Sequence, residues 1–216
     1  MGTRSAQEDV ELVVRTIAQT AVDNEKAFGD LDSVVGDGDF GFSLARGFEI
    51  VLADWDGYDR SDIGTFLQKV AVAITSRIGG TSGPIWGTAF LRAATTSKGK
   101  DTLTGEDAVA MLRAAIDGIK ARGNADVGDK TLLDALVPMT DTIEAGVQAG
   151  TGSDEIVAAA AVTAREAADA TVTMQAMRGR AAYTGERSIG SPDPGAVAVA
   201  VILERLAPAW PERPQS

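Results

Sequence analysis

Three carboxylates separated by glycines lie close together in the first quarter of the chain. Asp32, Asp37 and Asp39 fall within eight residues of the segment 31–41. Like charges about 4 Å apart cost roughly 4 kcal/mol at an effective dielectric near 20, and a divalent cation bound between them reverses that cost. The spacing does not match an EF-hand loop, because the twelfth position counted from Asp37 is Phe48 instead of a bidentate Glu. The pattern therefore indicates either a site for a hard cation or a solvated acidic turn.

A glycine-rich segment at residues 79–84, Gly-Gly-Thr-Ser-Gly-Pro, leads directly into an apolar stretch with helical spacing. Backbone N–H groups at such a helix start can hold an anion, and the helix dipole favours the negative charge. Thr81 and Ser82 add hydroxyl donors, and Pro84 suits the first turn of a helix. The segment lacks the Lys of a Walker A loop, so taken alone it is better explained as an ordinary turn between helices.

Three arginines and Tyr183 lie within residues 178–190 of an otherwise acidic chain. Arg suits phosphate because its planar fork donates two parallel hydrogen bonds. A solvated basic loop paired with nearby acids explains the segment equally well. Two further segments, 128–131 with an Asp–Lys charge pair and 191–195 with two prolines, are explained by ordinary helix capping when each is taken singly.

The composition excludes several kinds of site. The 216 residues include neither Cys nor His, which excludes disulfides, thiolate nucleophiles, zinc ribbons, Ser-His-Asp triads and phosphohistidine. A metal must therefore be held by oxygen ligands, which favours a hard cation such as Mg²⁺ or Ca²⁺. With 20 Lys and Arg against 31 Asp and Glu the net charge is −11, and the scattered basic residues argue against a nucleic-acid partner.

Helices must position these segments, because apolar residues recur at intervals of three and four along most of the chain. Ala, Val, Leu and Ile dominate the candidate core and aromatic residues make up only 5 %, which favours helix over strand. The two longer connections, 29–41 and 172–192, contain candidate sites, as long loops in compact domains often do. Breakers divide the pattern into eight predicted helices, at residues 5–28, 41–53, 61–77, 84–97, 104–122, 130–149, 153–171 and 193–207.

We expect a single all-α domain over residues 5–207, most simply an antiparallel bundle, followed by a frayed tail at residues 208–216 that contains three prolines. The longest apolar run, residues 196–203, is too short to span a membrane. The first residues lack the apolar core of a signal peptide, so a cytoplasmic protein without a membrane partner is expected.

Together the segments favour one ligand, a magnesium nucleotide at the rim of a helical bundle, with carboxylates for Mg²⁺, helix starts for phosphates and Arg for charge balance. In this order and spacing they make the chain, from about residue 5 to 207, resemble the nucleotide-binding L subunit of dihydroxyacetone kinases. The motifs that carry the resemblance are Asp32 with Asp37-Gly38-Asp39, Gly79-Gly80-Thr81-Ser82-Gly83-Pro84, Gly128-Asp129-Lys130-Thr131, Gly179-Arg180-Ala181, Gly185-Glu186-Arg187-Ser188-Ile189-Gly190 and Asp193-Pro194-Gly195.

The resemblance implies an eight-helix antiparallel barrel with the nucleotide site at one open end. It implies that Asp32, Asp37 and Asp39 hold two Mg²⁺ ions. It also implies that Asp37, Asp39 and Arg180 position the phosphoryl group, with no nucleophile or base on this chain. The implied contacts to ADP or ATP are Phe40, Gly41, Phe42, Ser43, Thr81, Ser82, Gly123, Leu132, Arg180, Asp193, Pro194 and Gly195.

The resemblance further implies phosphoryl transfer from this nucleotide to a ketose on a separate K subunit, which holds the ketose covalently through a histidine. A free-standing L chain favours ADP as a bound cofactor that a phosphotransferase-system protein rephosphorylates. The alternative is an ATP-dependent kinase subunit that acts on a four-carbon ketose such as erythrulose. The formation of a homodimer is also possible on this resemblance.

Two departures from the family pattern concern Phe40 and Ser191, which occupy positions where the family usually has His. Phe40 can neither hydrogen-bond a phosphate nor titrate, so the preference for ketose or nucleotide can differ. An alternative hypothesis from another functional class is that the protein is a non-catalytic helical adaptor whose acidic loop binds Ca²⁺ or nothing. That reading leaves the combination of motifs unexplained.

Overall fold

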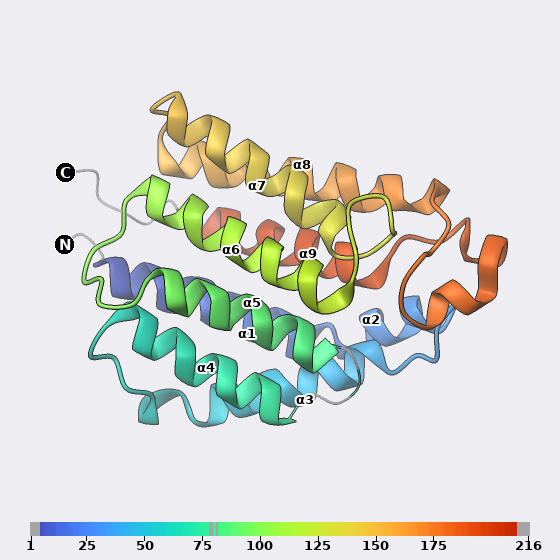
Figure 1. Ribbon diagram of the computed structural model, residues 1–216, viewed down its shortest axis with the longest axis horizontal. Coiled ribbons are helices and arrows are strands. Elements are labelled where there is room, and N and C mark those ends of the chain that lie inside the picture. Colours follow the sequence, from blue (N-terminus) through green and yellow to red (C-terminus); the bar gives the residue numbers. More distant parts are fainter. Residues whose placement is uncertain (1–4, 78–79, 81, 211–216) are drawn as a thin grey trace.

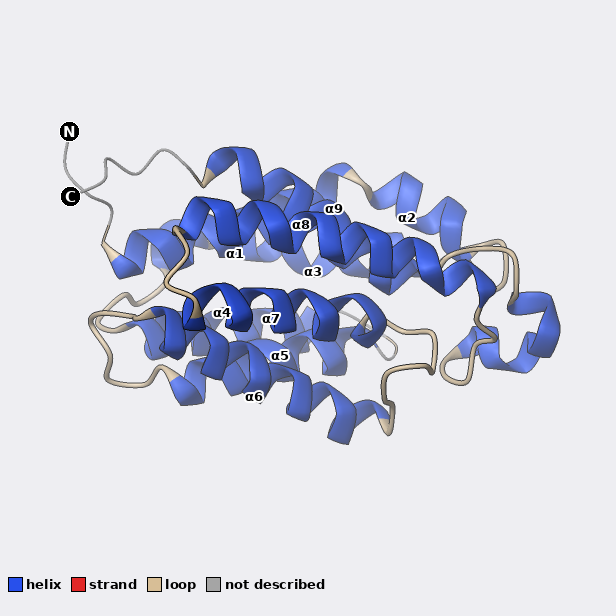
Figure 2. Ribbon diagram, turned by 90° about the horizontal axis from the view of Figure 1, so that it is seen from above, coloured by secondary structure: helices blue, strands red, loops and turns tan. Residues whose placement is uncertain are grey.

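The structure, a computed structural model, describes residues 5–77, 80 and 82–210. This part of the chain contains α-helices and short 3-10 helices and has no strand (Figure 1, Figure 2). The α-helices are α1 (Ala6–Asp23), α2 (Glu25–Asp32), α3 (Phe40–Ala53), α4 (Ile63–Arg77), α5 (Ser82–Thr96), α6 (Gly105–Gly123), α7 (Leu133–Gln148), α8 (Ser153–Ala170) and α9 (Pro194–Ala209). The 3-10 helices are η1 (Trp55–Gly57), η2 (Thr171–Thr173) and η3 (Arg180–Ser188). The prediction of an all-α fold is confirmed.

The long helices of the described chain pack in a closed ring. α1 packs against α3 and α9, α3 packs against α4, and each helix from α4 to α9 packs against the next one. Successive helices from α4 to α9 run in opposite directions (Figure 1). As a result, α3, α5, α7 and α9 all begin at the same end of the bundle, while the short α2 lies against α3.

The core of this ring is built from aliphatic side chains and a few aromatic ones. Phe48, Phe66 and Leu44 are fully buried, and Trp86 stands edge-on to Phe48 with 6.0 Å between ring centroids. Such close packing fixes the helix ends relative to one another, which is the requirement for a site built from several helix starts. Of the described helices, none is long and apolar enough to cross a membrane.

The prediction of a single helix over residues 5–28 is wrong. α1 ends at Asp23 and α2 begins at Glu25, although the apolar pattern continues to Phe28. The side chain of Asn24 donates to the Thr20 carbonyl at 2.9 Å, and such local side-chain bonds compete with continuation of a helix. Because α2 then extends to its C-terminal aspartate, the first long connection shrinks to residues 33–39.

The second long connection, 172–192, is also more ordered than a plain loop. It includes η2 and η3, and η3 is interrupted at Gly185, whose φ is +60°. At the other end of the chain, α9 continues to Ala209, while residues 211–216 lie outside the described part, so fraying of the tail stays a prediction.

Candidate functional site

A cavity of about 460 Å³ lies at the end of the bundle where α3, α5, α7 and α9 begin. It gathers most of the residues that the sequence and the resemblance single out. The predicted residues that line it are Asp32, Asp37, Asp39, Phe40, Ser43, Ser82, Gly123, Leu132, Arg180, Asp193, Pro194 and Gly195. Segments far apart in the sequence therefore converge on one site.

Two predicted nucleotide contacts do not line this cavity within the described chain. Gly41 faces α2, where an added Cβ would lie 2.0 Å from the Glu25 carbonyl oxygen. Phe42 is 55 % exposed and lines a separate shallow groove beside α2. Thr81 lies outside the described residues. Contacts from these three residues to a nucleotide stay predictions.

The three carboxylates converge because of the way the chain turns between α2 and α3. Asp32 is the last residue of α2 and Asp39 directly precedes α3. Each of the three carboxylates offers an oxygen atom, and these atoms lie within 4.8 Å of one another. Gly36 permits this turn, since a Cβ there would meet the Asp32 carboxylate at 2.2 Å, and the Phe40 N–H donates to the same carboxylate at 3.3 Å.

Arg180 reaches this carboxylate trio (Asp32, Asp37 and Asp39) from the opposite side of the cavity. Its guanidinium contacts the Asp37 carboxylate and lies 3.5 Å from the Asp39 carboxylate. Both ends of this contact are partly exposed, so the ion pairs themselves add little stability. One guanidinium leaves the charge of three carboxylates only partly balanced, which favours a further cation at the same place.

Opposite charge is supplied by the helix starts around the cavity. The lining includes residues at the beginning of four helices, α3, α5, α7 and α9. Each helix start carries a partial positive charge of about half an elementary charge and N–H groups without helical partners. Four such ends around one cavity favour a polyanionic ligand, which the carboxylate trio alone would repel.

An apolar wall completes the cavity. Ile85, Trp86, Ile119 and Leu132 line one side of it, and Ile85 and Leu132 belong to a small apolar cluster around the start of α7. Of these residues, only Leu132 was predicted to contact the nucleotide, and that prediction came from the family resemblance. The other residues have the spacing of ordinary core positions. A cavity with charged groups on one side and apolar side chains on another suits a ligand with a charged part and a flat apolar part.

Phe40, which replaces the usual His of the family pattern, packs against Phe28 with 6.1 Å between ring centroids. Its ring therefore joins α2 to the start of α3. The aromatic contact holds together the two helices that frame the carboxylate trio.

Lys130 is a lining residue to which the sequence assigned only a charge pair with Asp129. The structure places Asp129 against Arg178 at 2.9 Å instead. Lys130 is 3 % exposed, and its ammonium group donates to backbone carbonyls. Its backbone has a φ of +60°, in the left-handed region, which a right-handed helix cannot include. This explains why α7 begins at Leu133 and not at residue 130 as predicted.

Asp193 caps α9 from within the cavity. Its side chain accepts a hydrogen bond from the Ala196 N–H at 2.7 Å, and Pro194 occupies the first helical position. Burial raises the pKa of Asp193 to about 7, and repulsion from Asp134 acts in the same direction. The Ala196 hydrogen bond and the Lys130 ammonium group oppose this rise.

We expect an Asp193→Asn variant to lose a pH dependence of folding. The raised pKa means that the folded chain binds more protons than the unfolded chain between about pH 4 and pH 7. The contribution of Asp193 to the free energy of unfolding is therefore fully present below about pH 4 and is lost as the pH rises through about 7. Asn keeps an oxygen for the Ala196 N–H but does not ionise, so the decline, on the order of 1–4 kcal/mol, should disappear.

Urea unfolding of both chains at several pH values from 5 to 7.5 measures this difference. Carboxylates with lowered pKa, such as Asp23, Asp62 and Asp107, titrate below this interval and do not obscure it. Parallel curves for the two chains would contradict the assignment to Asp193.

Comparisons with known proteins agree on one family. The sequence model of the DAK2 domain matches residues 34–208. The PEP-dependent dihydroxyacetone kinase, ADP-binding subunit DhaL, of Escherichia coli (strain K12) is 40 % identical over 182 residues, which are 84 % of this chain and 87 % of the relative. The L-erythrulose 1-kinase of Mycolicibacterium smegmatis is 37 % identical over 207 residues, which are 95 % of this chain but 36 % of the relative.

The fold is similar to a solved kinase. The crystal structure of the dihydroxyacetone kinase from C. freundii in complex with AMP-PNP and Mg²⁺ superposes with a TM-score of 0.73 at 25 % sequence identity. The match covers 94 % of this chain and 33 % of that chain. This chain therefore spans most of the DhaL subunit but about a third of the erythrulose kinase and of the solved kinase.

Proposed function

Since this chain belongs to the DAK2 domain family, we propose that it is the nucleotide-binding subunit of a ketose kinase of the dihydroxyacetone kinase type, a phosphotransferase with an alcohol group as acceptor. The observation that carries the proposal is the meeting of three carboxylates, Arg180 and four helix starts around one cavity. In this proposal a phosphoryl group passes from a magnesium-bound nucleotide on this chain to a ketose held by a separate K subunit.

The side chains around the cavity fit a hard divalent cation. Asp32, Asp37 and Asp39 supply carboxylate oxygens within 4.8 Å of one another, which is the donor type that Mg²⁺ prefers. They would hold the two Mg²⁺ ions that the resemblance implies. Bound Mg²⁺ supplies charge neutralisation and orientation of the phosphate oxygens.

The rest of the cavity supplies binding and positioning. The start of α5 at Ser82 offers N–H groups to phosphates, and Arg180 adds a positive charge at the rim. At the start of α9 the Asp193 N–H is already donated to the Thr171 hydroxyl and the Ala196 N–H to the Asp193 carboxylate, so this end contributes through its helix dipole. The apolar wall formed by Ile85, Ile119 and Leu132 suits the nucleobase. No nucleophile is required of this chain, because phosphoryl transfer depends mainly on positioning and charge neutralisation.

The phosphoryl donor and the acceptor follow two patterns among the relatives. The DhaL relative, of nearly the same length as this chain, is named as an ADP-binding subunit of a PEP-dependent kinase. We therefore favour ADP as a bound cofactor that a phosphotransferase-system protein rephosphorylates, in a cytoplasmic assembly with a K subunit. The erythrulose kinase relative, which matches 95 % of this chain, supports the second candidate, an ATP-dependent subunit that acts on a four-carbon ketose.

Dialysis followed by a nucleotide assay separates the two candidates. ADP retained through extensive dialysis in Mg²⁺ would support the cofactor, and rapid exchange with ATP would support the ATP-dependent kinase. In both cases Mg·ADP at about 100 times its Kd should add about 2.7 kcal/mol to the free energy of unfolding. A chain without retained nucleotide and without any nucleotide-dependent rise in Tm would contradict the proposed function and favour an adaptor.

A further inference from the structure

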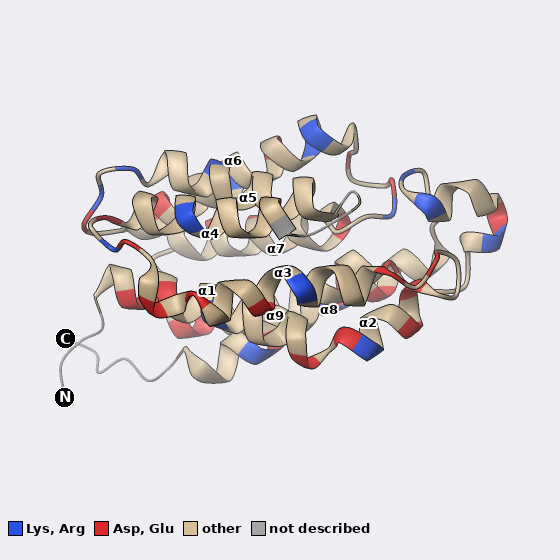
Figure 3. Ribbon diagram, turned by 90° about the horizontal axis from the view of Figure 1, so that it is seen from below, with Lys and Arg blue, Asp and Glu red and all other residues tan. Residues whose placement is uncertain are grey.

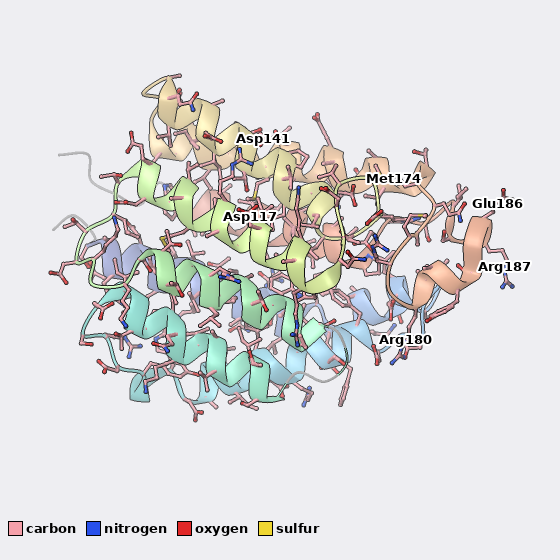
Figure 4. The ribbon with its side chains drawn as sticks, in the orientation of Figure 1. Asp117, Asp141, Met174, Arg180, Glu186 and Arg187 are labelled. Carbon is pink, nitrogen blue, oxygen red and sulfur yellow. The ribbon has the colours of Figure 1, made fainter. Side chains whose placement is uncertain are left out.

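Residues 174–191, here called the arginine loop, leave the bundle after η2 and return just before α9. Figure 4 shows Met174 at the inner end of this loop, and Glu186 and Arg187 on its outer side. Within the loop, the Arg180 side chain is 59 % exposed and Tyr183 is 91 % exposed. A loop so exposed needs firm attachment at its base if Arg180 is to meet the carboxylate trio reproducibly.

Both ends of the arginine loop are attached to one side chain. The Lys130 ammonium group donates to the Met174 carbonyl at 3.1 Å, to the Ser191 carbonyl at 2.7 Å and also to the Ser188 carbonyl. An ammonium group has three N–H donors, so these three carbonyls use all of them. Lys130 therefore has no donor left for a phosphate, although it lines the cavity.

The conformation of Lys130 is unfavourable by itself. A left-handed backbone is unfavourable for a non-glycine residue, and burial of an ammonium group adds a desolvation penalty. The pKa of Lys130 is lowered by this burial. Three charge-assisted hydrogen bonds offset these costs, which is expected where a precise loop position is needed.

Additional hydrogen bonds also fasten the base of the arginine loop. The Ser188 hydroxyl accepts from the Ala176 N–H at 2.8 Å and donates to the Gly185 carbonyl at 2.6 Å. The Met177 N–H donates to the Asp129 carbonyl at 3.0 Å. The base of the loop is therefore closed by hydrogen bonds, and Lys130 lies at its centre.

We propose that Lys130 is a positioning residue that closes the base of the arginine loop and thereby holds Arg180 across the cavity from the carboxylate trio. The part of this inference that concerns nucleotide affinity rests on the proposed function. The part that concerns the loop does not. Two readouts are needed so that the two proposals can fail separately.

The first readout is trypsin cleavage of the chain without nucleotide, with cut sites identified by mass spectrometry. Lys130→Met removes the three hydrogen bonds while keeping a long unbranched side chain at the same backbone position. We expect cleavage after Arg178, Arg180 and Arg187 to accelerate about tenfold. The free energy of opening the loop should fall by roughly the net contribution of one charge-assisted hydrogen bond, and the population of the open, cleavable state rises accordingly. Unchanged cleavage at these sites would overturn the inference.

Lys100→Met is the matched control. Lys100 is paired with Asp107 at 2.6 Å between α5 and α6, at the opposite end of the bundle from the cavity. This control should leave cleavage in the arginine loop unchanged. If it accelerates cleavage there as strongly as Lys130→Met does, the effect is a general loss of stability and the inference is wrong.

The second readout is the Kd of Mg·ADP in a double-mutant cycle with Arg180→Ala. Each single variant should weaken binding about tenfold, since each removes the contribution of Arg180 to phosphate binding. If Lys130 acts through Arg180, Lys130→Met should have no further effect in the Arg180→Ala chain. Equal losses in both backgrounds would overturn the positioning role, and failure of the unmodified chain to bind Mg·ADP would overturn the proposed function alone.

A second variant covers the case in which Lys130→Met does not fold. Ser188→Ala removes the hydroxyl that bridges Ala176 and Gly185 at the base of the same loop. It should accelerate cleavage at the same arginines and weaken Mg·ADP binding only when Arg180 is present. A Ser188→Ala chain that matches the unmodified chain in both readouts would contradict the inference.

Discussion

An Asp37→Ala chain should lose Mg²⁺-dependent nucleotide binding and phosphoryl transfer while it keeps its fold. Asp37 belongs to the carboxylate trio and is also the acid in closest contact with Arg180. Its removal leaves two carboxylates for a divalent cation and frees the guanidinium from its main partner. We expect a loss of at least a hundredfold in Mg·ADP affinity, because ligands and their charge partners commonly contribute one to two powers of ten each.

The stability of the same variant should change little in the absence of Mg²⁺. Asp37 is partly exposed, and its removal relieves repulsion within the trio while it breaks an exposed ion pair. The measurement is therefore a pair of melting curves, with and without Mg·ADP, together with a binding isotherm. The unmodified chain should gain Tm with Mg·ADP, and the Asp37→Ala chain should not.

Asp30→Ala is the matched control for this experiment. Asp30 lies on α2 two residues before Asp32, and it pairs with Lys26 on the exposed surface of the helix. Its replacement removes the same charge from α2, a short distance along the chain from Asp37, without touching the trio. Full nucleotide binding by Asp37→Ala, or an equal loss in Asp30→Ala, would contradict a metal site at the trio.

The acidic loop could be predicted from the sequence because its geometry is local. Asp32, Asp37 and Asp39 are neighbours along the chain, and the glycines between them favour a tight turn. Arg180 was singled out by its unusual surroundings, but its target could not be derived from spacing, since more than 140 residues separate it from Asp37. The family resemblance implied only that Arg180 contacts the nucleotide and positions the phosphoryl group. The contact between Arg180 and Asp37 comes from the structure.

Other features could not be predicted because they depend on side-chain contacts that the apolar spacing does not reveal. The apolar stripe that crosses Asn24 predicts one helix, and only the hydrogen bond from its side chain to Thr20 explains the interruption. The role of Lys130 depends on carbonyls 44 to 61 residues away, so the adjacent Asp129 was a misleading partner. Figure 3 shows Lys and Arg scattered among acidic residues. The expectation of no nucleic-acid partner stays a prediction.

Gly41→Ala should destabilise the fold and weaken the site together. An added Cβ at Gly41 would lie 2.0 Å from the Glu25 carbonyl oxygen and 2.6 Å from the Gly29 nitrogen. Both are backbone atoms of α2, which cannot rotate away as a side chain can. α2 and α3 would have to separate, at a cost of about 1–3 kcal/mol, which for a chain of this size lowers Tm by on the order of 5–10 °C.

The Gly41→Ala substitution should also affect the site, because α2 and α3 carry or adjoin two of the three carboxylates. α2 ends at Asp32 and α3 begins directly after Asp39, so a shift between them moves two members of the carboxylate trio apart. Gly41 was predicted to contact the nucleotide, and the crossing of α2 and α3 gives a different reason why glycine is needed there. The two explanations differ in their expected result, because loss of a direct nucleotide contact would weaken binding without lowering the Tm of the nucleotide-free chain.

Gly57→Ala separates crowding from the general effect of replacing glycine with alanine. Gly57 ends η1, has no heavy atom within 4 Å of an added Cβ, and does not have a left-handed backbone. Its replacement should change the free energy of unfolding by less than about 0.5 kcal/mol and leave Mg·ADP affinity unchanged. If Gly41→Ala were as harmless as Gly57→Ala, the crossing of α2 and α3 would have room to adjust. Close glycine packing would then not be what sets the spacing of the carboxylate trio.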